Sequence, residues 1–458
     1  MTGQDNPLRS ALFTDLYELT MARAYAAVSM DETAVFELFF RRLPASRGFL
    51  LAAGLDDVLA YLESWRFTPG DIDHLAKLGL FPDDFLDRLS GLRFTGNVRA
   101  VPEGTAVFPG EPLLAVEAPI MQAQIVETLA INQIHFQTMA ATKSARTVLA
   151  ARGRAVVDFG SRRAHGTDAA LKVARAAWLA GAAGTSNVLA GKLYGVPVSG
   201  TMAHSFVQAH ASEYEAFRDF ARLFPGTTLL VDTYDTLEGA AQVVRLAREL
   251  GDDFRVGAIR IDSGDLAGLA RACRDILDQA GLTKVRIFAT SELDEYAVAD
   301  LLDRGAPIDG FGVGTRLAVS ADAPALDMVY KLTEYAGQGR AKLATGKVLH
   351  PGRKQVFRFF ENGRMARDLV CRLDEEPGGE PLLREVMRNG ERTGAGRETL
   401  AQCRERAAAQ LNALPEFLRS LGGPIAPYRV EFSRALEADL ERIRAEHRPN
   451  PSGPLSRP

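Results

Sequence analysis

The segment from Ile308 to Thr315, with the sequence IDGFGVGT, contains residue types that can bind a phosphate group. Its glycines Gly310, Gly312 and Gly314 would let backbone N–H groups approach an anion without interference from a Cβ atom. Thr315 adds a hydroxyl donor. A plain tight turn is the alternative interpretation. Because the segment comes late in a series of strand-like runs, where α/β barrels usually bind phosphate, we favour phosphate binding.

Arginine and aspartate side chains occur together around residues 256–265. Arg260 and Asp262 lie two positions apart, so they would share one face of a strand. An arginine among acids can hold a carboxylate bidentately, while the acids take ribose hydroxyls or Mg²⁺. For Ser263 and Asp265, capping of a following helix is the better interpretation, because such side chains satisfy free amides there.

Two other strand-like runs end in charged side chains. Asp232 follows an apolar run and could bind a hydroxyl group or a metal ion, whereas Asp235 nearby could cap a helix. Arg162 and Arg163 follow the run at residues 155–159 and could supply positive charge to a phosphate. A solvated surface pair is the alternative for these two arginines.

His204 lies just beyond a strand-like run and close to Gly200. A lone histidine is more often a structural hydrogen-bonding residue than a catalyst, and both interpretations stay open here. The sequence contains no HExxH motif or similar pair, so we do not expect a histidine-bound metal ion.

Short β-rich runs alternate with helical stretches from about Ala155 onward, which is typical of βαβ units around a parallel sheet. The predicted strands are residues 155–159, 196–201, 228–232, 256–262, 285–290 and 308–313. The predicted helices between them include residues 236–250, 266–280 and 292–304. In a barrel the carboxyl ends of all strands meet at one mouth, whereas in an open sheet only those near the switch point meet. The polar strand ends therefore favour a barrel.

The chain of 458 residues is long enough to divide into a large and a small domain. We expect an irregular or incomplete TIM-like α/β barrel at residues 136–335 and a smaller α+β domain. The small domain would combine residues 1–135 with a returning segment at 336–446, followed by a flexible Pro-rich tail at 447–458. Further predicted elements are helices at 13–25 and 121–152, and strands at 34–40, 355–360 and 366–372. No motif after Tyr330 points to chemistry.

Bulk composition excludes several classes of protein. Hydrophobic residues make up 47% and charged residues 24% of the chain, as in globular proteins with a large core. A net charge of -4, without a run of Lys and Arg, does not indicate nucleic-acid binding. We find neither a signal peptide nor an apolar run long enough to span a membrane. Three separated cysteines, without CxxC spacing, fit a reduced cytoplasmic location.

Seven ordered stretches together resemble the nicotinate phosphoribosyltransferases. The resemblance covers Thr14 to about Leu332, most of the chain. The stretches that carry it are residues 14–21, 158–166, 184–191, 200–206, 232–234, 260–266 and 310–315.

This resemblance implies an ATP-dependent, ligase-type reaction in NAD biosynthesis. Nicotinate and phosphoribosyl pyrophosphate would give nicotinate mononucleotide and pyrophosphate, while ATP is hydrolysed to ADP and phosphate. His204 would be phosphorylated transiently by ATP. Mg²⁺ would arrive with the substrate pyrophosphate rather than on a side-chain motif.

The same resemblance assigns roles to individual residues. Thr201 and Arg260 match positions that contact nicotinate. Tyr17 would stack on the pyridine ring from the partner subunit, which implies a homodimer with shared active sites. Asp232 and Asp262 would act with His204 in catalysis, and Arg162 would line the substrate pocket. Phosphate would be bound by Gly312, Gly314 and Thr315.

Two positions depart from the patterns of these families, and the sequence leaves some alternatives open. Ser186 stands where nicotinamide-specific enzymes carry an aspartate, which would repel a carboxylate substrate. Glu292 replaces a glycine or asparagine, and its role is not assigned, nor are those of Arg163 and Asp265.

Nicotinamide or quinolinate phosphoribosyltransferase is the first alternative function. A barrel lyase or aldolase is remote, because the strands end in Arg, Asp and His rather than Lys. A non-catalytic phosphate-binding protein is equally remote.

Overall fold

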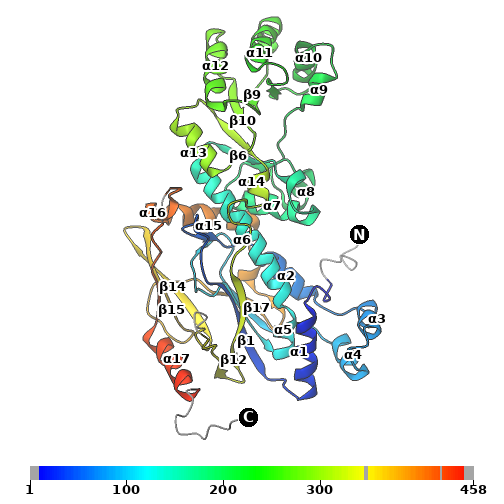
Figure 1. The fold of residues 1–458 in the computed structure, drawn as a ribbon, viewed down its shortest axis with the longest axis vertical. Helices are drawn as coiled ribbons and strands as arrows, with labels where there is room; N and C mark the ends of the chain where they lie inside the picture. The colour runs from blue at the N-terminus through cyan, green and yellow to red at the C-terminus, as the bar shows by residue number, and fades with distance from the viewer. Residues whose placement is uncertain (1–9, 345–348, 423–424, 448–458) are drawn as a thin grey trace, which may run out of the picture. The chain divides into compact units, whose positions relative to one another are not determined.

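The computed structural model describes residues 10–344, 349–422 and 425–447, and these residues form two compact units (Figure 1). Unit 1 contains residues 10–138, 325–344, 349–420 and 425–447. Unit 2 contains residues 139–324 together with 421 and 422. The boundary at Thr138 falls inside the helix α6 (Glu127–Ala150), which therefore belongs partly to each unit. Apart from His447, the expected tail at 447–458 lies outside the described residues.

Unit 1 is built around a seven-stranded antiparallel sheet. Its inner strand β1 (Thr33–Phe40) is almost entirely buried and pairs with β12 (Met328–Tyr335) on one side and β5 (Leu114–Pro119) on the other. The pairing with β12 joins segments that are about 300 residues apart in sequence, since Leu38 lies opposite Tyr330. The sheet is completed by β13 (Gln338–Gly339), β3 (Asn97–Ala100), β17 (Arg384–Arg388) and β18 (Glu391–Arg392).

Smaller sheets and helices complete unit 1. A four-stranded sheet holds β16 (Glu380–Pro381), β14 (Lys354–Glu361), β15 (Arg364–Arg372) and β19 (Val430–Phe432), and a pair is formed by β2 (Leu50–Leu51) and β4 (Ala106–Val107). The helices are α1 (Leu16–Ala27), α2 (Leu55–Ser64), α3 (Pro69–Lys77), α4 (Asp83–Ser90), α5 (Ile120–Ile125), α15 (Leu400–Ala413), α16 (Glu416–Arg419) and α17 (Arg434–Glu446).

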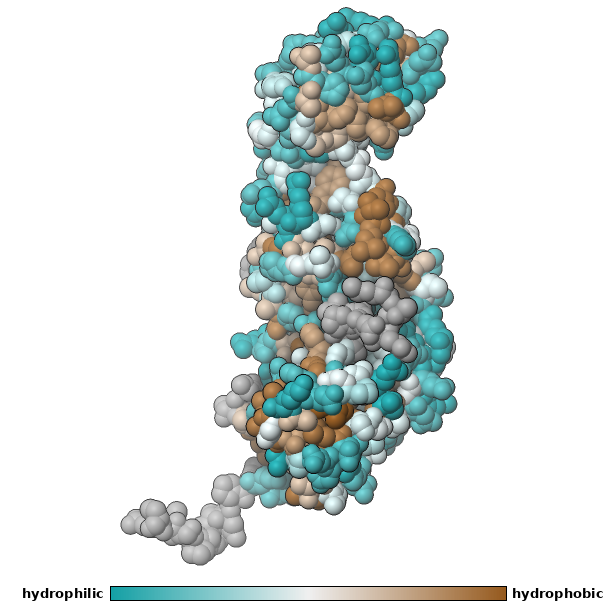
Figure 2. Space-filling view, turned by 90° about the vertical axis from the view of Figure 1, so that its right-hand side faces the viewer, coloured by the Kyte–Doolittle hydropathy of each residue, from teal (hydrophilic) through white to brown (hydrophobic). Residues whose placement is uncertain are grey.

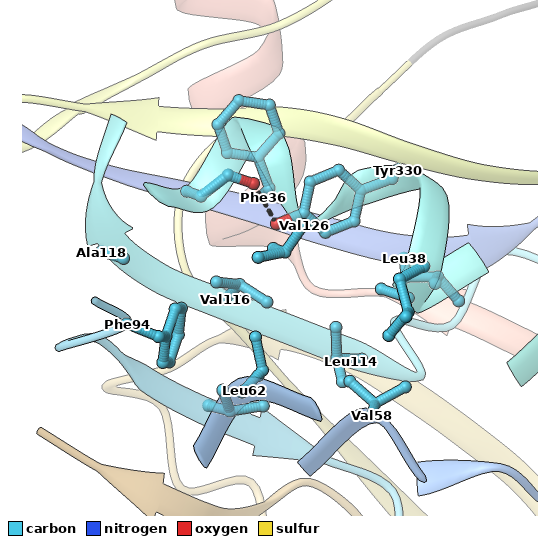
Figure 3. Packing of buried hydrophobic residues seen from close by; sticks show 14 of the residues in the cluster. Phe36, Leu38, Val58, Leu62, Phe94, Leu114, Val116, Ala118, Val126 and Tyr330 are labelled. Carbon is cyan, nitrogen blue, oxygen red and sulfur yellow. Dashed lines mark hydrogen bonds between the residues drawn. The ribbon is translucent and has the colours of Figure 1, made fainter. Parts of the chain in front are cut away.

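The core of unit 1 lies against its large sheet (Figure 3). The rings of Phe36 and Tyr330 stack with their centroids 5.0 Å apart, and the Tyr330 hydroxyl donates a hydrogen bond to the carbonyl of Ala123 at 2.7 Å. Leu38 and Val116 are fully buried beside them. Burying each such side chain stabilises the fold by roughly 1.5–3 kcal/mol.

Unit 2 is an α/β unit with a curled sheet of six parallel strands. The strands lie in the order β7 (Gly184–Thr185), β6 (Ala155–Asp158), β11 (Gly310–Val313), β10 (Arg286–Ala289), β9 (Ala258–Ile261) and β8 (Thr228–Leu230). Strands that follow one another in the sequence are neighbours in the sheet, and the first strand, β6, pairs with the last, β11. The ring is open at one place, because no pairing between β7 and β8 exists among the described residues.

Helices follow the strands of unit 2: α7 (Thr167–Leu179), α8 (Val188–Tyr194), α9 (His204–Gln208), α10 (Glu213–Leu223), α11 (Thr236–Leu250), α12 (Leu266–Gln279), α13 (Glu295–Asp303) and α14 (Thr315–Ala318). The helix α11 buries residues at helical spacing, including Ala240, Val243 and Val244, against the sheet. Gly239 permits this contact, because a Cβ there would lie 2.1 Å from the carbonyl oxygen of Val231.

Two predicted elements differ from the structure, and one strand was not predicted. Residues 196–201 do not form a strand, and only Val198 makes a single bridge to Thr185 of β7, a strand that the prediction missed. Pro197 has no N–H and cannot donate in a ladder, which explains the short pairing. The predicted helix at 121–152 is two helices, α5 and α6, that meet at Val126. None of the described helices has the length and apolar character needed to cross a membrane.

Candidate active site

A cavity of about 580 Å³ opens at the carboxyl ends of the parallel strands in unit 2. Its volume is in the range of small-molecule sites, and its position is where α/β proteins bind ligands. Most of the residues that the sequence singled out lie in its wall: Arg162, Ser186, Thr201, His204, Arg260, Asp262, Gly312, Gly314 and Thr315.

His204 lies at the first position of the short helix α9 and contacts two other loops. Its Nδ1 atom is 3.1 Å from the hydroxyl oxygen of Thr233, in the loop after β8. Its Nε2 atom is 3.7 Å from Oδ2 of Asp262, in the loop after β9. The imidazole side chain is 40% exposed, so it is held by neighbours on two sides yet stays accessible from the cavity.

Arg260 extends from β9 into the cavity wall, and its side chain is only 14% exposed. Its Nη1 atom donates hydrogen bonds to the hydroxyl of Thr201 and to the carbonyl of Met202, the latter at 3.3 Å. Its Nη2 atom lies 3.6 Å from Asp262. Burial lowers the pKa of the Arg260 guanidinium from its ordinary value, and the nearby charge of Arg162 lowers it further. The carboxylates of Asp262 and Asp232 act in the opposite direction and raise this pKa.

The carboxylates Asp232 and Asp262 are linked by hydrogen bonds at the ends of neighbouring strands. Asp232 Oδ2 accepts from the amide of Asp262 at 2.8 Å and from the hydroxyl of Ser263 at 2.6 Å. Oδ1 of Asp232 is buried and has no hydrogen-bond partner. Asp232 is not in the cavity wall itself, but it holds the backbone of Asp262, which is.

Of the two residues expected to cap the helix α12, Asp265 occupies the N-cap position and Ser263 does not. The Asp265 carboxylate pairs with Arg304 at 2.9 Å, and this contact together with hydrogen bonds from the amides of Gly268 and Ala267 lowers the pKa of Asp265. Ser263 instead donates to Asp232. Asp235 caps α11, accepting from the amides of Leu237 and Glu238.

The glycines of the segment at 308–315 have two different roles. A Cβ on Gly312 would lie 2.6 Å from Thr290 and 2.7 Å from Phe159, so this glycine is required by packing inside the sheet. Gly314 and Thr315 follow the strand and face the cavity. Of the expected phosphate-binding glycines, only Gly314 has an amide in the loop itself.

The loop after β6 is a short 3-10 turn, Ser161–Arg163. Asp158 anchors this turn because it is fully buried and accepts from the amide of Gly160 at 2.8 Å and from the hydroxyl of Thr185 at 2.7 Å. Burial raises the pKa of Asp158 above its ordinary value, while these two hydrogen bonds oppose the shift. One carboxyl group thus connects the loop of Arg162 with the strand that precedes Ser186.

The cavity wall also contains Arg163, which the sequence analysis proposed as positive charge for a phosphate, and Glu292, which it noted as a departure from the family pattern. Sequence reasoning did not predict the other residues of the wall: Phe159, Ser161, Gly200, Met202, Ala203, Thr290 and Ser291. Most of them adjoin predicted positions in the same loops. For Thr290 and Ser291, which follow β10, the position at a strand end was the available signal. Tyr17 belongs to unit 1, where it lies on α1 and is 45% exposed.

A cavity of about 570 Å³ in unit 1 lacks such chemistry. Its arginines are neutralised by carboxylates of the same wall, because Arg353 pairs with Glu334 at 3.0 Å and Arg372 with Asp439 at 3.6 Å. Nowhere in the described part of the chain do three or more His, Cys, Asp or Glu side chains gather in a way that could hold a metal ion.

Comparison with known proteins identifies the family. Residues 12–135 match the nicotinate phosphoribosyltransferase (NAPRTase) N-terminal domain, and residues 154–355 match the nicotinate phosphoribosyltransferase (NAPRTase) family. The nicotinate phosphoribosyltransferase pncB2 of Mycobacterium tuberculosis is 56% identical over 434 residues, which are 95% of this chain and 94% of the relative. The chain belongs to the nicotinate phosphoribosyltransferase family. It is therefore an enzyme of NAD biosynthesis that acts on nicotinate, as the sequence predicted.

Other members of the family support the same conclusion. The nicotinate phosphoribosyltransferase of Bacillus subtilis is 43% identical over 384 residues, covering 82% of this chain and 78% of the relative. The crystal structure of human nicotinic acid phosphoribosyltransferase superposes with a TM-score of 0.83 at 31% identity, covering 94% of this chain and 99% of the human one. The lyase, aldolase and non-catalytic interpretations are set aside by this membership.

Proposed function

We propose that the cavity in unit 2 binds nicotinate and phosphoribosyl pyrophosphate, and that His204 carries a phosphoryl group from ATP during turnover. The observation that carries the proposal is that His204, Arg260 and Thr315 line one cavity although they come from three separate segments of the chain. Asp262 lies between the first two, within 3.7 Å of each.

Arg260 would hold the carboxylate of nicotinate. Its buried guanidinium is anchored by Thr201, so its position is fixed before the substrate arrives. Fixing the ring in this way would direct its nitrogen to C1 of the ribose, and such positioning can lower a barrier by several kcal/mol. Tyr17 would stack on the pyridine ring from the partner subunit.

The transfer breaks the bond between ribose C1 and a pyrophosphate oxygen and forms a bond from C1 to the pyridine nitrogen. Positive charge develops on the ribose during this step, and the carboxylates of Asp262 and Asp232 would stabilise it. The leaving pyrophosphate would be neutralised by Arg162 and by donors of Gly314 and Thr315. No ion pair joins Arg162 to a carboxylate among the described residues, so its charge is available for such an anion.

ATP would act through His204. A lone pair of the imidazole would accept the terminal phosphoryl group, ADP would leave, and water would later release the group as phosphate. The exposed, doubly contacted ring supports this role.

Magnesium would enter with the pyrophosphate of the substrate. Mg²⁺ is usually bound by one or two carboxylates together with substrate phosphates, and Asp262 is a carboxylate of the cavity wall that would fit that pattern. The ion would supply charge neutralisation at the leaving group.

A homodimer is supported by an exposed apolar patch on unit 2. Val188, Leu189 and Leu193 of α8 are 73%, 51% and 54% exposed, and Val198 beside them is 51% exposed. A hydrophobic area at the level of α8 is visible in Figure 2. Contiguous apolar surface of this kind commonly marks a protein interface.

The remaining expectations concern architecture and location. The ring-like strand order supports describing unit 2 as an incomplete TIM-like barrel. Its main segment, residues 139–324, is shorter than the expected barrel domain at 136–335, because β12 (Met328–Tyr335) pairs with β1 in the large sheet of unit 1. Cys273, Cys371 and Cys403 are all buried and unbonded, which fits a reducing cytoplasm.

The proposal is tested by measuring nicotinate mononucleotide with and without ATP, using wild type, His204→Ala and the control His210→Ala. His210 lies in the same unit but bonds only to the carbonyl of Phe206 and faces Asp219, away from the cavity wall. We expect ATP to stimulate wild type and His210→Ala, and His204→Ala to retain only slow transfer that ATP does not accelerate. Undiminished stimulation of His204→Ala would contradict the phosphohistidine.

A further inference from the structure

The segment from Thr290 to Asp294, after β10, connects two sides of the cavity. We propose that the ion pair between Asp294 and Arg316 holds the phosphate-binding loop in place, which makes Arg316 a positioning residue for phosphoribosyl pyrophosphate. This inference rests on the proposed role of Gly314 and Thr315 in phosphate binding.

Asp294 is a fixed anchor. Its side chain is 12% exposed, and its Oδ1 atom accepts from the amides of Tyr296 at 3.1 Å and Ala297 at 2.9 Å, so it caps the helix α13. Its other oxygen, Oδ2, accepts from Nη1 of Arg316 at 3.0 Å. A carboxylate that accepts from three donors has little freedom to move. The ion pair therefore joins Arg316 to the fixed first turn of α13.

Arg316 directly follows Thr315, which faces the cavity and is exposed. Arg316 itself is not part of the cavity wall, so it would act on the ligand through the backbone of its neighbour. Its guanidinium also lies 3.9 Å from Glu292, a residue of the same connecting segment that does line the cavity. Two carboxylates of one loop therefore hold the residue next to the proposed phosphate contact.

The other end of the segment is anchored on the histidine side. The hydroxyl of Thr290 donates to Oδ1 of Asp262, whose second oxygen faces His204. Between the anchors, Ser291 has a φ of 120°, a conformation that residues with a Cβ rarely adopt. Such backbone strain persists only where the surroundings impose it, and here the two anchors do so.

The test compares Arg316→Ala, Arg316→Lys and the control Arg304→Ala. Arg304 is a matched control because its side chain is 45% exposed, against 46% for Arg316, and it also pairs with an aspartate of unit 2, away from the cavity. We expect Arg316→Ala to raise the KM for phosphoribosyl pyrophosphate about fivefold and to change the KM for nicotinate by less than about twofold. Arg316→Lys should recover part of the loss, and Arg304→Ala should behave as wild type.

A second variant tests whether the aspartate is the partner. Asp294→Asn keeps a good cap for α13 but removes the charge. We expect Asp294→Asn combined with Arg316→Ala to be no worse than Arg316→Ala alone, because both changes remove one interaction. If the two changes raise the KM for phosphoribosyl pyrophosphate additively, the proposal is overturned. It is also overturned if Arg316→Ala raises the KM of both substrates equally or leaves both at the wild-type value, or if Arg316→Lys does not lower the KM for phosphoribosyl pyrophosphate relative to Arg316→Ala.

Failure of this inference can be separated from failure of the phosphate assignment by Thr315→Val, which removes only the hydroxyl. If Thr315→Val and Arg316→Ala both raise the KM for phosphoribosyl pyrophosphate, the proposal is supported. If only Thr315→Val does so, the phosphate site stands and the role of Arg316 is wrong. If Thr315→Val has no effect, the phosphate contact is wrong, and Arg316 does not act through it.

Discussion

The imidazole Nδ1 of His204 lies 3.1 Å from the hydroxyl oxygen of Thr233. The nitrogen on the opposite side of the ring, Nε2, is directed at Asp262. Because a hydrogen bond at one ring nitrogen orients the imidazole, Thr233 and Asp262 together fix the direction of the His204 ring.

Replacing Thr233 should therefore weaken the coupling to ATP. In Thr233→Val the ring loses its partner at nearly unchanged volume, and we expect ATP stimulation to fall about fivefold while the rate without ATP is preserved. Thr233→Ser, which keeps the hydroxyl, should restore most of the stimulation. Equal rates of wild type and Thr233→Val at all ATP concentrations would show that the contact has no role in catalysis.

Arg260→Ala should separate the two substrates kinetically. We expect the KM for nicotinate to rise at least about tenfold through loss of the charged hydrogen bonds, with a much smaller effect on phosphoribosyl pyrophosphate. Arg260→Lys should restore only part of the affinity for nicotinate, since an ammonium group cannot bind a carboxylate bidentately. Steady-state kinetics with each substrate varied in turn gives the answer, and an equal rise of both constants would refute the carboxylate contact.

Ser186→Asp should change the choice between nicotinate and nicotinamide. A new carboxylate in the cavity wall would repel the acid substrate and accept from the amide of nicotinamide. We expect kcat/KM for nicotinate to fall and the ratio of nicotinamide to nicotinate turnover to rise in competition assays. Ser186→Asn, equal in size but uncharged, is the control. If both variants lower nicotinate turnover equally, crowding rather than charge is responsible.

Glu18 should make the stability of the protein depend on pH. Burial raises the pKa of Glu18 from its ordinary value of 4.5 to about 7, and Glu127 and Asp15 add to the shift, while hydrogen bonds from Thr128 and Thr14 oppose it. Between pH 4.5 and about 7, Glu18 therefore keeps its proton in the folded state but has released it in the unfolded state. The contribution to stability is complete below 4.5 and is lost as the pH rises through 7.

Denaturant unfolding across this pH range measures the effect. We expect the free energy of unfolding of wild type, relative to Glu18→Gln, to fall by up to about 3 kcal/mol as the pH rises. Glu32→Gln is the control, because Glu32 is exposed in the same unit. A constant difference between wild type and Glu18→Gln would show that Glu18 does not retain its proton.

Periodicity predicted the parallel sheet of unit 2 well because its strands and helices carry strong local signals. The helix α11, for example, has the predicted bounds, with Asp235 as its cap. Residues 196–201 were predicted wrongly, since β-branched residues suggest a strand whereas Pro197 prevents its pairing. The two-residue strand β7 is too short to have any periodicity.

Most residues of the cavity wall could be predicted from strand ends, but the partners that hold them could not. No sequence signal shows that Thr233 contacts His204, that Thr290 contacts Asp262 or that Asp294 pairs with Arg316, because these are tertiary contacts. Likewise, Gly312 looked like a phosphate-binding glycine, yet its neighbours Phe159 and Thr290 show that packing requires it.

The pairing of β1 with β12 has a consequence for synthesis on the ribosome. Phe40 at the end of β1 emerges about 290 residues before Met328, its partner in β12, which at usual elongation rates corresponds to roughly 15–60 s. During that interval β1 can pair with β5 on one side, while its other edge, rich in phenylalanine, has no strand to cover it. Nascent chains of this enzyme are therefore exposed to edge-to-edge aggregation until more than two thirds of the chain has been made.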